Sequence, residues 1–427
     1  MAHLVLVETT PTAGFKIVQE AVALGHEVTF VAESLDPYLA AEGGEEAVRT
    51  PTRIRTGITT ADPGSLREEL ERLHREHPVH GLLALSEGHL PAIAEAAHAL
   101  GLPFESPETT KRLRNKHEVR LLLDDAGVPQ PAFRQALTAE EAVAAAEELG
   151  YPVVVKPADG FGSVRVGVAE TAGEVAELAE AVLATRVYGR GITGIGVVLL
   201  ERYVPGPVVS CEMLTVDGAH HPYGCVDKML SPPPYPVELG GCFPAELPDD
   251  VRDAVVDVCA RALDAAGVRR GHTHTEVVLG PEGPAIIEIN GRLIGGYVPT
   301  MMNHVLGRNV YHDVIDLALG GSPRPSAAHG VGCIRALTAP AAGVLAGIGA
   351  DAARRGPGVA EVMLHARPGR RVRPARDNFD RLGFLITTGA TAPEARAAAE
   401  AAHDRVEVRV TPEPEGREPE APEGVVA

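Results

Sequence analysis

The sequence has no tryptophan, few aromatic residues and few lysines. Aromatic residues make up 4% of its 427 residues, and only five of its 39 basic residues are lysine. Where a chain prefers arginine so strongly, a retained lysine can mark a position that needs a compact ammonium group.

The chain also has no apolar run of about 18 residues and no basic start followed by an apolar stretch. We therefore expect a cytoplasmic protein without a signal peptide or a membrane span.

Cysteine is scarce as well, and its spacing argues against two structural roles. The cysteines are odd in number and contain no CxxC pair; they are Cys211, Cys225, Cys242, Cys259 and Cys333. This pattern predicts neither a disulfide framework nor a zinc site, and it fits a reducing compartment.

A formal net charge of −19 argues against nucleic acid as a partner, because phosphate backbones require a positive face. Residues 411–427 are rich in Glu and Pro, and we expect this acidic tail to be disordered.

The common nucleotide-binding fingerprints are also missing. The first apolar segment, 3–9, leads into ETTPTAGF where a dinucleotide-binding domain has GxGxxG, and the chain contains no Walker A motif. Apolar strands and amphipathic helices nevertheless alternate over residues 1–108, with strands expected near 3–9, 27–33 and 79–87. This alternation predicts an N-terminal parallel α/β domain.

The rest of the chain mixes α/β and α+β patterns. We expect a second domain over 109–322, with a small lobe at about 130–203, and a third, α/β domain over 323–410. The expected helices are 108–126, 139–149, 172–184, 248–266, 303–319 and 392–403.

Segment 272–292 contains two short apolar strands joined by a turn centred on Glu282. In an antiparallel hairpin, residues equidistant from the turn face each other, and residues two apart share a face. One polar face of the hairpin is therefore expected to hold His274, Glu276, Glu288 and Asn290. Opposed carboxylates repel unless a positive charge lies between them, and a divalent cation held by carboxylate and amide oxygens is the natural candidate. The alternative is a solvated hairpin with two unrelated acids.

A glycine-rich segment follows Lys156, which lies at the end of a predicted strand. It contains Gly160, Gly162 and Ser163. Glycine lets backbone N–H groups approach an oxyanion, and the adjacent lysine adds a point charge. A hairpin of this kind can cover the phosphates of a nucleotide, although a glycine-rich hairpin with a surface lysine has the same sequence signature.

Several further positions have two interpretations. Glu201 ends an apolar run before a proline-containing connection, where it either meets an adenine or ribose group or is a surface acid. Lys228 and Glu238 bound a proline-rich loop, either against a substrate or as an exposed pair. His274 is expected on the metal side of the hairpin, whereas His272 is equally compatible with a hydrogen-bonded core histidine.

In order and spacing, these segments resemble the ATP-grasp superfamily. The matching features are Lys116, VVVKPADGFGS, LLERYVPGP followed by SCE, TEVVL and EINGR. The resemblance covers nearly the whole chain and implies an ATP-grasp fold with an N-terminal parallel α/β domain and a small C-terminal domain. It also implies an ADP-forming carboxylate–amine ligase. Such an enzyme converts a carboxylate to an acylphosphate, which an amine attacks to give an amide or peptide bond.

The resemblance implies a role for each matching residue. The residues expected on ATP are Lys116, Lys156, Gly160, Gly162, Ser163, Glu201, Tyr203, Val204 and Glu212. The residues expected on Mg²⁺, or on Mn²⁺ in its place, are Glu276, Glu288 and Asn290. Arg292 is expected to hold the carboxylate or the transferring phosphoryl group. The expected catalytic residues are Arg292, Lys156 and Glu288.

Within the superfamily, EINGRLIGGYVP is most similar to the L-amino-acid ligases, which join amino acids or related acids into dipeptides. Loop 228–244 would line the substrate pocket, where several members have a histidine and this chain has Gly240, Gly241 and Cys242. This departure leaves the identity of the attacking amine open. The residues expected on the substrates are Lys228, Glu238, His274, Arg292, Gly295 and Gly296.

Two other functions fit parts of the pattern. A biotin carboxylase or a purine-pathway carboxylase shares the fold and the metal pair, but carboxylases have Val-Glu-His where Gly295 and Gly296 follow Arg292 here. A non-catalytic nucleotide-binding protein would have no reason to keep opposed carboxylates. We therefore expect small-molecule carboxylate and amine substrates, no nucleic-acid or membrane partner, and a homodimer as the default assembly.

Overall fold

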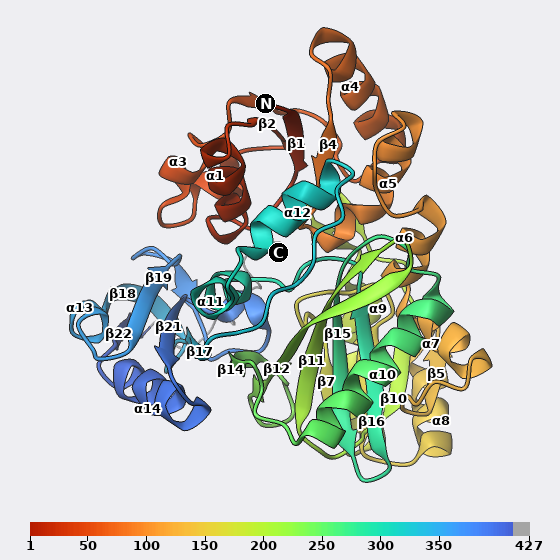
Figure 1. Ribbon diagram of the computed structural model, residues 1–427. Coiled ribbons are helices and arrows are strands. Elements are labelled where there is room, and N and C mark those ends of the chain that lie inside the picture. Colours follow the sequence, from red (N-terminus) through yellow and green to blue (C-terminus); the bar gives the residue numbers. More distant parts are fainter. Residues whose placement is uncertain (413–427) are drawn as a thin grey trace.

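The computed structural model describes residues 1–412, and its three parts surround a common centre (Figure 1). The predicted acidic tail lies almost wholly in 413–427, outside the described residues. Within the described chain, no helix is both long enough and apolar enough to cross a membrane. The predicted division at residues 108, 322 and 410 stays a prediction.

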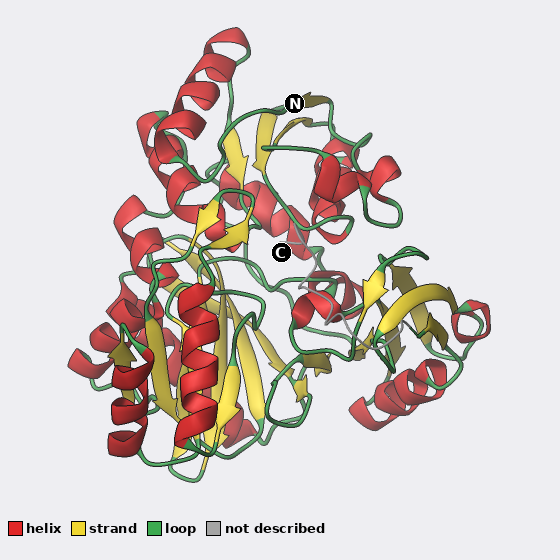
Figure 2. Cartoon of the chain, turned by 180° about the vertical axis from the view of Figure 1, so that it is seen from behind, coloured by secondary structure: helices red, strands yellow, loops and turns green. Residues whose placement is uncertain are grey.

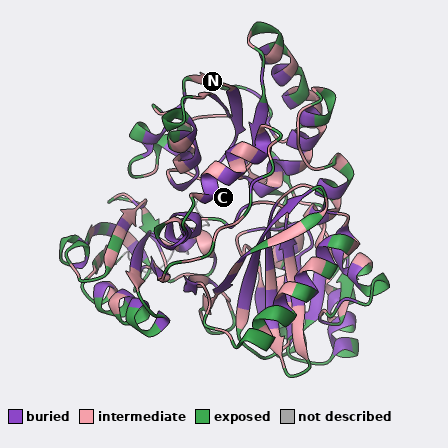
Figure 3. Ribbon diagram, in the orientation of Figure 1, coloured by how far each residue is buried: buried purple, intermediate pink, exposed green. Residues whose placement is uncertain are grey.

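The N-terminal part is a parallel sheet with the strand order β3-β2-β1-β4. Its strands are β1 His3–Val7, β2 Glu27–Val31, β3 Arg53–Arg55 and β4 Gly81–Leu83. Its helices are η1 Ala13–Phe15, α1 Lys16–Ala23, α2 Asp36–Leu39, α3 Gly44–Ala47, α4 Pro63–Glu76, η2 Glu87–His89 and α5 Leu90–Ala99. Every residue of β1 is buried, as expected for a strand covered on both faces (Figure 3). The predicted parallel α/β pattern is confirmed, although α4 was not anticipated despite its Asp62 cap and Pro63 start.

The helix predicted over 108–126 is in fact two helices. They are α6 Pro107–Arg114 and α7 Lys116–Asp125. Asn115 separates them in an extended conformation, and its side chain accepts hydrogen bonds from the backbone N–H groups of His117 and Glu118. An asparagine that caps a helix in this way ends the preceding one, and it places Lys116 at the first position of α7.

A small antiparallel sheet, here called the lid sheet, follows with the order β5-β10-β6-β7. Its strands are β5 Phe133–Ala136, β6 Val153–Pro157, β7 Gly167–Ala169 and β10 Val198–Arg202. Two helices with the predicted bounds pack on it, α8 Ala139–Leu149 and α9 Ala172–Ala184. A short hairpin projects from the same part of the chain, formed by β8 Val187–Gly189 and β9 Ile192–Thr193.

The central sheet has the order β12-β11-β15-β16 and is antiparallel. Its strands are β11 Val208–Val216, β12 Ala219–Asp227, β15 Gly271–Gly280 and β16 Gly283–Asn290. The long helix α10 Asp249–Ala266 buries its apolar side against β11, β15 and β16. The view from behind shows helices lying in front of the strands of the sheets (Figure 2).

Two more helices connect the central sheet to the C-terminal part. The helix predicted over 303–319 is replaced by α11 Val298–Val305 and α12 Val310–Ala318. The break has the same cause as the first one: the side chain of Asn309 accepts from the backbone N–H of Tyr311 and caps α12.

The C-terminal part contains a five-stranded sheet, β13-β14-β17-β21-β19, and a three-stranded sheet, β20-β18-β22. Their strands are β13 Met229–Leu230, β14 Glu238–Phe243, β17 Val331–Leu337, β18 Gly343–Gly349, β19 Val359–Leu364, β20 Arg371–Val372, β21 Gly383–Gly389 and β22 Glu407–Thr411. The helices are α13 Asp351–Arg354, η3 Asn378–Asp380 and α14 Ala392–His403, the last with its predicted bounds. The segment expected as loop 228–244 is therefore partly strand, and β14 extends the C-terminal sheet.

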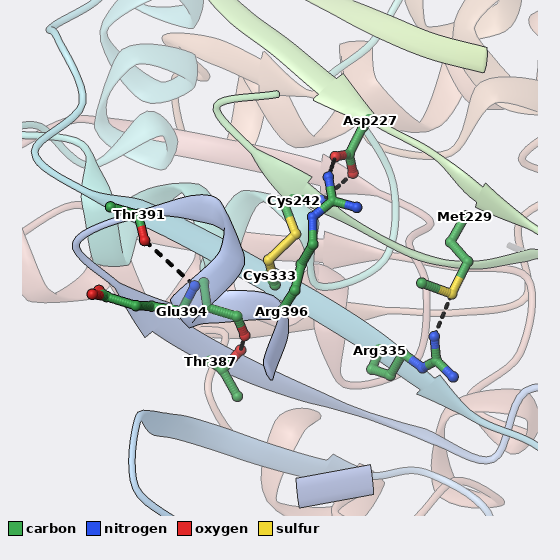
Figure 4. The surroundings of a disulfide bond; sticks show 10 residues. Asp227, Met229, Cys242, Cys333, Arg335, Thr387, Thr391, Glu394 and Arg396 are labelled. Carbon is green, nitrogen blue, oxygen red and sulfur yellow. Dashed lines mark hydrogen bonds and ion pairs between the residues drawn. A yellow bond between two sulfur atoms is a disulfide. The ribbon is translucent and has the colours of Figure 1, made fainter. Parts of the chain in front are cut away.

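A disulfide bond joins β14 to β17, although the cysteine pattern predicted no disulfide framework and a reducing compartment (Figure 4). Cys242 and Cys333 are directly opposed partners in the antiparallel pair, with their Cα atoms 4.0 Å apart. They lie 91 residues apart in sequence, so no local spacing pattern indicates the pairing. The other three cysteines are free and buried.

The disulfide gives a direct prediction for the number of reactive thiols. In denaturant without reductant we expect three thiols per chain, and five after reduction. Because the bond closes a loop of about 90 residues, replacing both Cys242 and Cys333 with Ser should lower the free energy of unfolding by about 2–5 kcal/mol. Thiol titration and urea unfolding measure the two effects; five thiols before reduction would contradict the bond.

Candidate active site

A cavity of about 850 Å³ lies between the lid sheet, the central sheet and the C-terminal part. Ligand pockets commonly have volumes of roughly 300–1,000 Å³. The predicted site residues that line it are Lys116, Lys156, Gly160, Gly162, Ser163, Glu201, Tyr203, Val204, Lys228, Glu238, His274, Glu276, Glu288, Asn290, Arg292, Gly295 and Gly296. Within the described chain, Glu212 is the one predicted site residue that does not line the cavity. The fold thus gathers predicted residues up to 180 positions apart, from Lys116 to Gly296, around one space.

The hairpin of β15 and β16 has the predicted register beyond a β-bulge between Glu276 and Val277. Next to the turn the register differs by one residue, because Gly280 pairs with Gly283. Glu276 pairs with Glu288, and His274 pairs with Asn290. In the structure each acid faces its own lysine: Lys228 Nζ lies 2.5 Å from Glu276, and Lys116 Nζ lies 3.3 Å from Glu288. The opposed carboxylates are therefore balanced by two ammonium groups.

Lys228, which is 3% exposed, is the centre of a buried charge cluster. Although burial alone would lower it, the carboxylates of Glu238 and Glu276 raise the pKa of Lys228 above its usual value. Burial would raise the pKa of Glu276, but Lys228 and His274 hold it well below the usual range. Both groups are thus charged at neutral pH.

The two histidines of the hairpin have different environments. His274 lines the cavity and lies 2.8 Å from Glu212 and 3.2 Å from Glu276. Burial opposes its charge, but Glu212 raises the pKa of His274 to about 9, so the ring is cationic. Glu212 therefore lies behind His274 and acts on the cavity through it. His272 stacks on Tyr223 instead, and burial lowers the pKa of His272 to about 3.

Glu87, which was not among the predicted site residues, lies beside the hairpin at the start of η2. Its carboxylate accepts from Arg292 (3.0 Å) and Arg114 (2.7 Å). Burial would raise the pKa of Glu87, but Arg292 and Arg114 lower it. The Asn290 amide lies 2.6 and 3.1 Å from the two Glu87 oxygens and 3.2 Å from Glu288, so its nitrogen can donate to these acids. A sequence signal existed: Glu87 follows the carboxyl end of a parallel strand, where α/β folds place functional groups.

At the other end of the cavity Lys156 is held by a buried ion-pair chain. Lys156 Nζ lies 2.8 Å from one oxygen of Glu201, and Arg120 lies 2.7 Å from the other. Arg120, also missed from the sequence, donates to the carbonyl groups of Ile286 and Ile287 on β16. Burial lowers the pKa of Lys156, whereas Arg120 and Lys156 outweigh burial and lower the pKa of Glu201. Glu201 is thus a buried ion-pair partner of Lys156 and Arg120, not a surface acid.

The glycine-rich loop closes over the cavity and touches two other parts. Lys116 Nζ donates to the carbonyl oxygen of Gly160 (2.5 Å). The carbonyl oxygen of Gly162 accepts from the backbone N–H of Asn378 in the C-terminal part (3.1 Å). Gly162 has φ +65°, and a Cβ there would lie 2.9 Å from the Phe379 ring, so glycine is required both for the turn and for the close approach.

The β8–β9 hairpin makes a second contact, with the N-terminal part. Arg190 at its tip donates to the carbonyl oxygen of Thr9 (2.5 Å) and to the Tyr38 hydroxyl (3.0 Å), and it lies 3.5 Å from Glu8. Arg190 also lies over the Tyr38 ring at 5.1 Å. The segment that contains the lid sheet therefore contacts both the C-terminal part and the N-terminal part.

Models of known families match the chain along most of its length. The ATP-grasp N-terminal domain matches residues 18–104, the ATP-grasp domain matches 106–187 and 149–301, and the L-amino acid ligase C-terminal domain 2 matches 335–411.

Individual proteins and solved structures agree with these matches. The uncharacterized protein y4rH of Sinorhizobium fredii is 31% identical, over 96% of this chain and 83% of its own length. An alanine–anticapsin ligase of Bacillus subtilis is 23% identical, over 60% of this chain and 57% of its own length. The crystal structure of an L-amino acid ligase from Bacillus licheniformis has a TM-score of 0.80 at 25% identity, covering 96% of this chain and 99% of that chain. A biotin carboxylase from Campylobacter jejuni has a TM-score of 0.70 at 18% identity, over 95% of this chain and 92% of its own, which shows a shared fold alone.

The fold and the matches define an ATP-grasp enzyme. This chain belongs to the ATP-grasp family and carries the C-terminal domain of the L-amino acid ligases. It is an ADP-forming carboxylate–amine ligase close to those enzymes.

The charge on His274 gives stability a defined pH dependence. Its pKa is raised from 6.5 to about 9, so its stabilising contribution is complete below pH 6.5 and is lost as pH rises through 9. In urea unfolding we expect the stability of the wild type to fall across this window more than that of His274→Gln. His98→Gln, at an exposed position of α5, serves as the matched control. Equal slopes for wild type and His274→Gln would show that the ring is neutral.

Proposed function

We propose that this enzyme activates a small-molecule carboxylate, an amino acid or a related acid, as an acylphosphate and couples it to an amine. The observation that carries the proposal is that three cations, Lys156, Lys116 and Arg292, line the same cavity as the opposed acids Glu276 and Glu288. Bringing a carboxylate to a triphosphate requires positive charge of this kind, because both reactants are anions.

ATP would lie between the lid sheet and the central sheet. Lys116, Lys156 and the backbone of Gly160, Gly162 and Ser163 suit the phosphates, since they combine point charges with accessible N–H groups. Tyr203 and Val204, where the chain leaves β10, suit the adenine. Glu201 is engaged by Lys156 and Arg120, so its contribution is to orient Lys156 beside the nucleotide.

The hairpin residues fit a hard divalent cation. Glu276, Glu288 and Asn290 supply carboxylate and amide oxygens, which Mg²⁺ and Mn²⁺ prefer. No group of three or more His, Cys, Asp and Glu side chains among the described residues forms a self-sufficient metal site, which is consistent with a cation that also needs phosphate oxygens. A bound Mg²⁺ would neutralise phosphate charge during phosphoryl transfer.

In the first step a carboxylate oxygen attacks the γ-phosphorus, the bond to the β,γ-bridging oxygen breaks, and ADP leaves. Arg292 suits the incoming carboxylate or the transferring phosphoryl group, and Glu87 holds its guanidinium in place (3.0 Å). In the second step the amine nitrogen attacks the acyl carbon, phosphate leaves with the C–O bond electrons, and the nitrogen gives up a proton to the departing phosphate or to water. No side-chain nucleophile is needed.

The substrates would lie beyond Arg292. Gly295 and Gly296 leave space on one wall, and Lys228, Glu238 and His274 provide charged groups on another. Gly240 lines the cavity from β14, while Cys242 is tied to Cys333, so this strand offers backbone in place of a histidine side chain.

A substrate screen tests the proposed reaction. With ATP, Mg²⁺ and pairs of amino acids, we expect phosphate release that requires both an acid and an amine, with amide products in mass spectrometry. Release that depends on bicarbonate and biotin would instead indicate a carboxylase. Absence of release with every pair would indicate a non-catalytic nucleotide-binding protein.

Replacing Glu288 with Gln keeps the shape of the side chain and removes its charge. We expect phosphate release to fall by at least about 100-fold, because a cation loses a carboxylate ligand. Glu282→Gln, at the exposed turn of the same hairpin, should have near-normal activity. Near-normal turnover of Glu288→Gln with an unchanged melting temperature would rule out the metal role.

A further inference from the structure

One segment of the C-terminal part is strongly basic in an acidic protein. Residues 365–381 contain six arginines and two aspartates, whereas the whole chain has a net charge of −19. Both aspartates are already engaged, because Arg373 lies 2.9 Å from Asp380 and 3.1 Å from Asp377. The segment therefore has positive charge that its own acids do not balance.

Arg370 and Arg381 bring this charge to the wall of the cavity. Their hydrogen bonds go to backbone carbonyl groups: Arg370 donates to Phe379 (2.8 Å), and Arg381 donates to Asn378 (2.8 Å) and Glu238 (3.2 Å). The nearest carboxylate oxygen to Arg381 belongs to Glu238, at 3.9 Å, and Glu238 is shared with Lys228 at 3.6 Å. A third arginine of the wall, Arg367, lies 3.5 Å from Glu42.

Partial burial makes these cations costly to the folded state. Arg381 has a side chain that is 16% exposed, and burial lowers the pKa of both Arg381 and Arg370. The neighbouring His365 does not add charge, because burial lowers the pKa of its ring to about 4. A cation that is partly removed from water and has too few anionic partners is stabilised most strongly when an anionic ligand binds beside it.

Both arginines line the cavity, and Arg381 lies near its predicted substrate end. Arg381 stacks over the Phe384 ring at 5.0 Å, and Phe384 lies beside Tyr297 and within 4.0 Å of the space that a Cβ on Gly296 would take. Arg381 does not contact the hairpin directly: it lies next to Glu238, which is next to Lys228, and Lys228 is the residue that contacts Glu276.

We propose that Arg370 and Arg381 form a subsite for a second, non-reacting carboxylate of a substrate. This inference rests on the proposed ligase function and adds to it the charge of the substrate. The carboxylate belongs either to the side chain of the activated acid or to the amine substrate, and both sources present the same anion to the guanidinium groups of Arg370 and Arg381.

Product formation with charged and neutral substrate pairs tests the subsite. Glu is compared with Gln as the acid and as the amine, and Ala is compared with alaninamide as the amine, each with a fixed neutral partner. In at least one comparison the wild type should favour the anionic member by about tenfold or more in kcat/KM, because a site built for a charged group rejects the analogue that lacks it. The same ratio should fall towards one in Arg370→Gln and in Arg381→Gln, and Arg381→Lys should restore part of it.

Arg355→Gln, an exposed arginine of the same part of the chain, is the matched control and should keep the wild-type ratio. A wild type that forms products but shows no preference in any comparison would overturn the subsite alone. Variants that lose charged and neutral substrates equally would assign the arginines a structural role and overturn it too. Absence of product with every pair would overturn the ligase function itself, and the subsite with it. If Arg381→Gln fails to fold, Arg370→Gln decides the question.

Discussion

Two like charges held face to face are the constraint on which the cavity depends. The pairing of β15 with β16 puts Glu276 opposite Glu288, and backbone hydrogen bonds fix that register. Such a pair costs stability unless cations surround it. Lys116, Lys228 and the protonated His274 meet this requirement, and they come from three different segments of the chain. The hairpin therefore determines which cations must be present and where the neighbouring elements have to place them.

The same reasoning extends to the buried pairs behind the cavity wall. Arg120, at 2% exposure, joins Glu201 on the lid sheet to carbonyl groups of β16 in the central sheet. Breaking a buried ion pair by removing one partner commonly costs about 3–5 kcal/mol, so these contacts keep Lys156 at a fixed position between the sheets. Glu87 does the same for Arg292 from the N-terminal part. Groups that reach the cavity are thus oriented before any ligand arrives.

Sequence reasoning succeeded where the signal is local. Helices 139–149, 172–184 and 392–403 have caps and an apolar stripe within a few turns. The opposition of Glu276 and Glu288 was also predicted, although a β-bulge between Glu276 and Val277 contributes to it in the structure. It failed where the deciding contact is distant. Nothing near Arg120 indicates a partner 81 residues away, and the Cys242–Cys333 bond spans 91 residues. A different error joined two helices into one at two places in the prediction. Asn115 and Asn309 are recognisable helix caps, but a prediction from apolar periodicity alone does not take caps into account.

Arg190, at the tip of the β8–β9 hairpin, balances a buried acid of the N-terminal part. Glu8, Tyr38 and Thr60 form a buried hydrogen-bonded group, and Arg190 supplies the positive charge next to its carboxylate. Moving the hairpin away from the N-terminal part would leave that carboxylate in the protein interior without its cation, which costs free energy. The contact therefore favours the arrangement of the two parts that the structure shows.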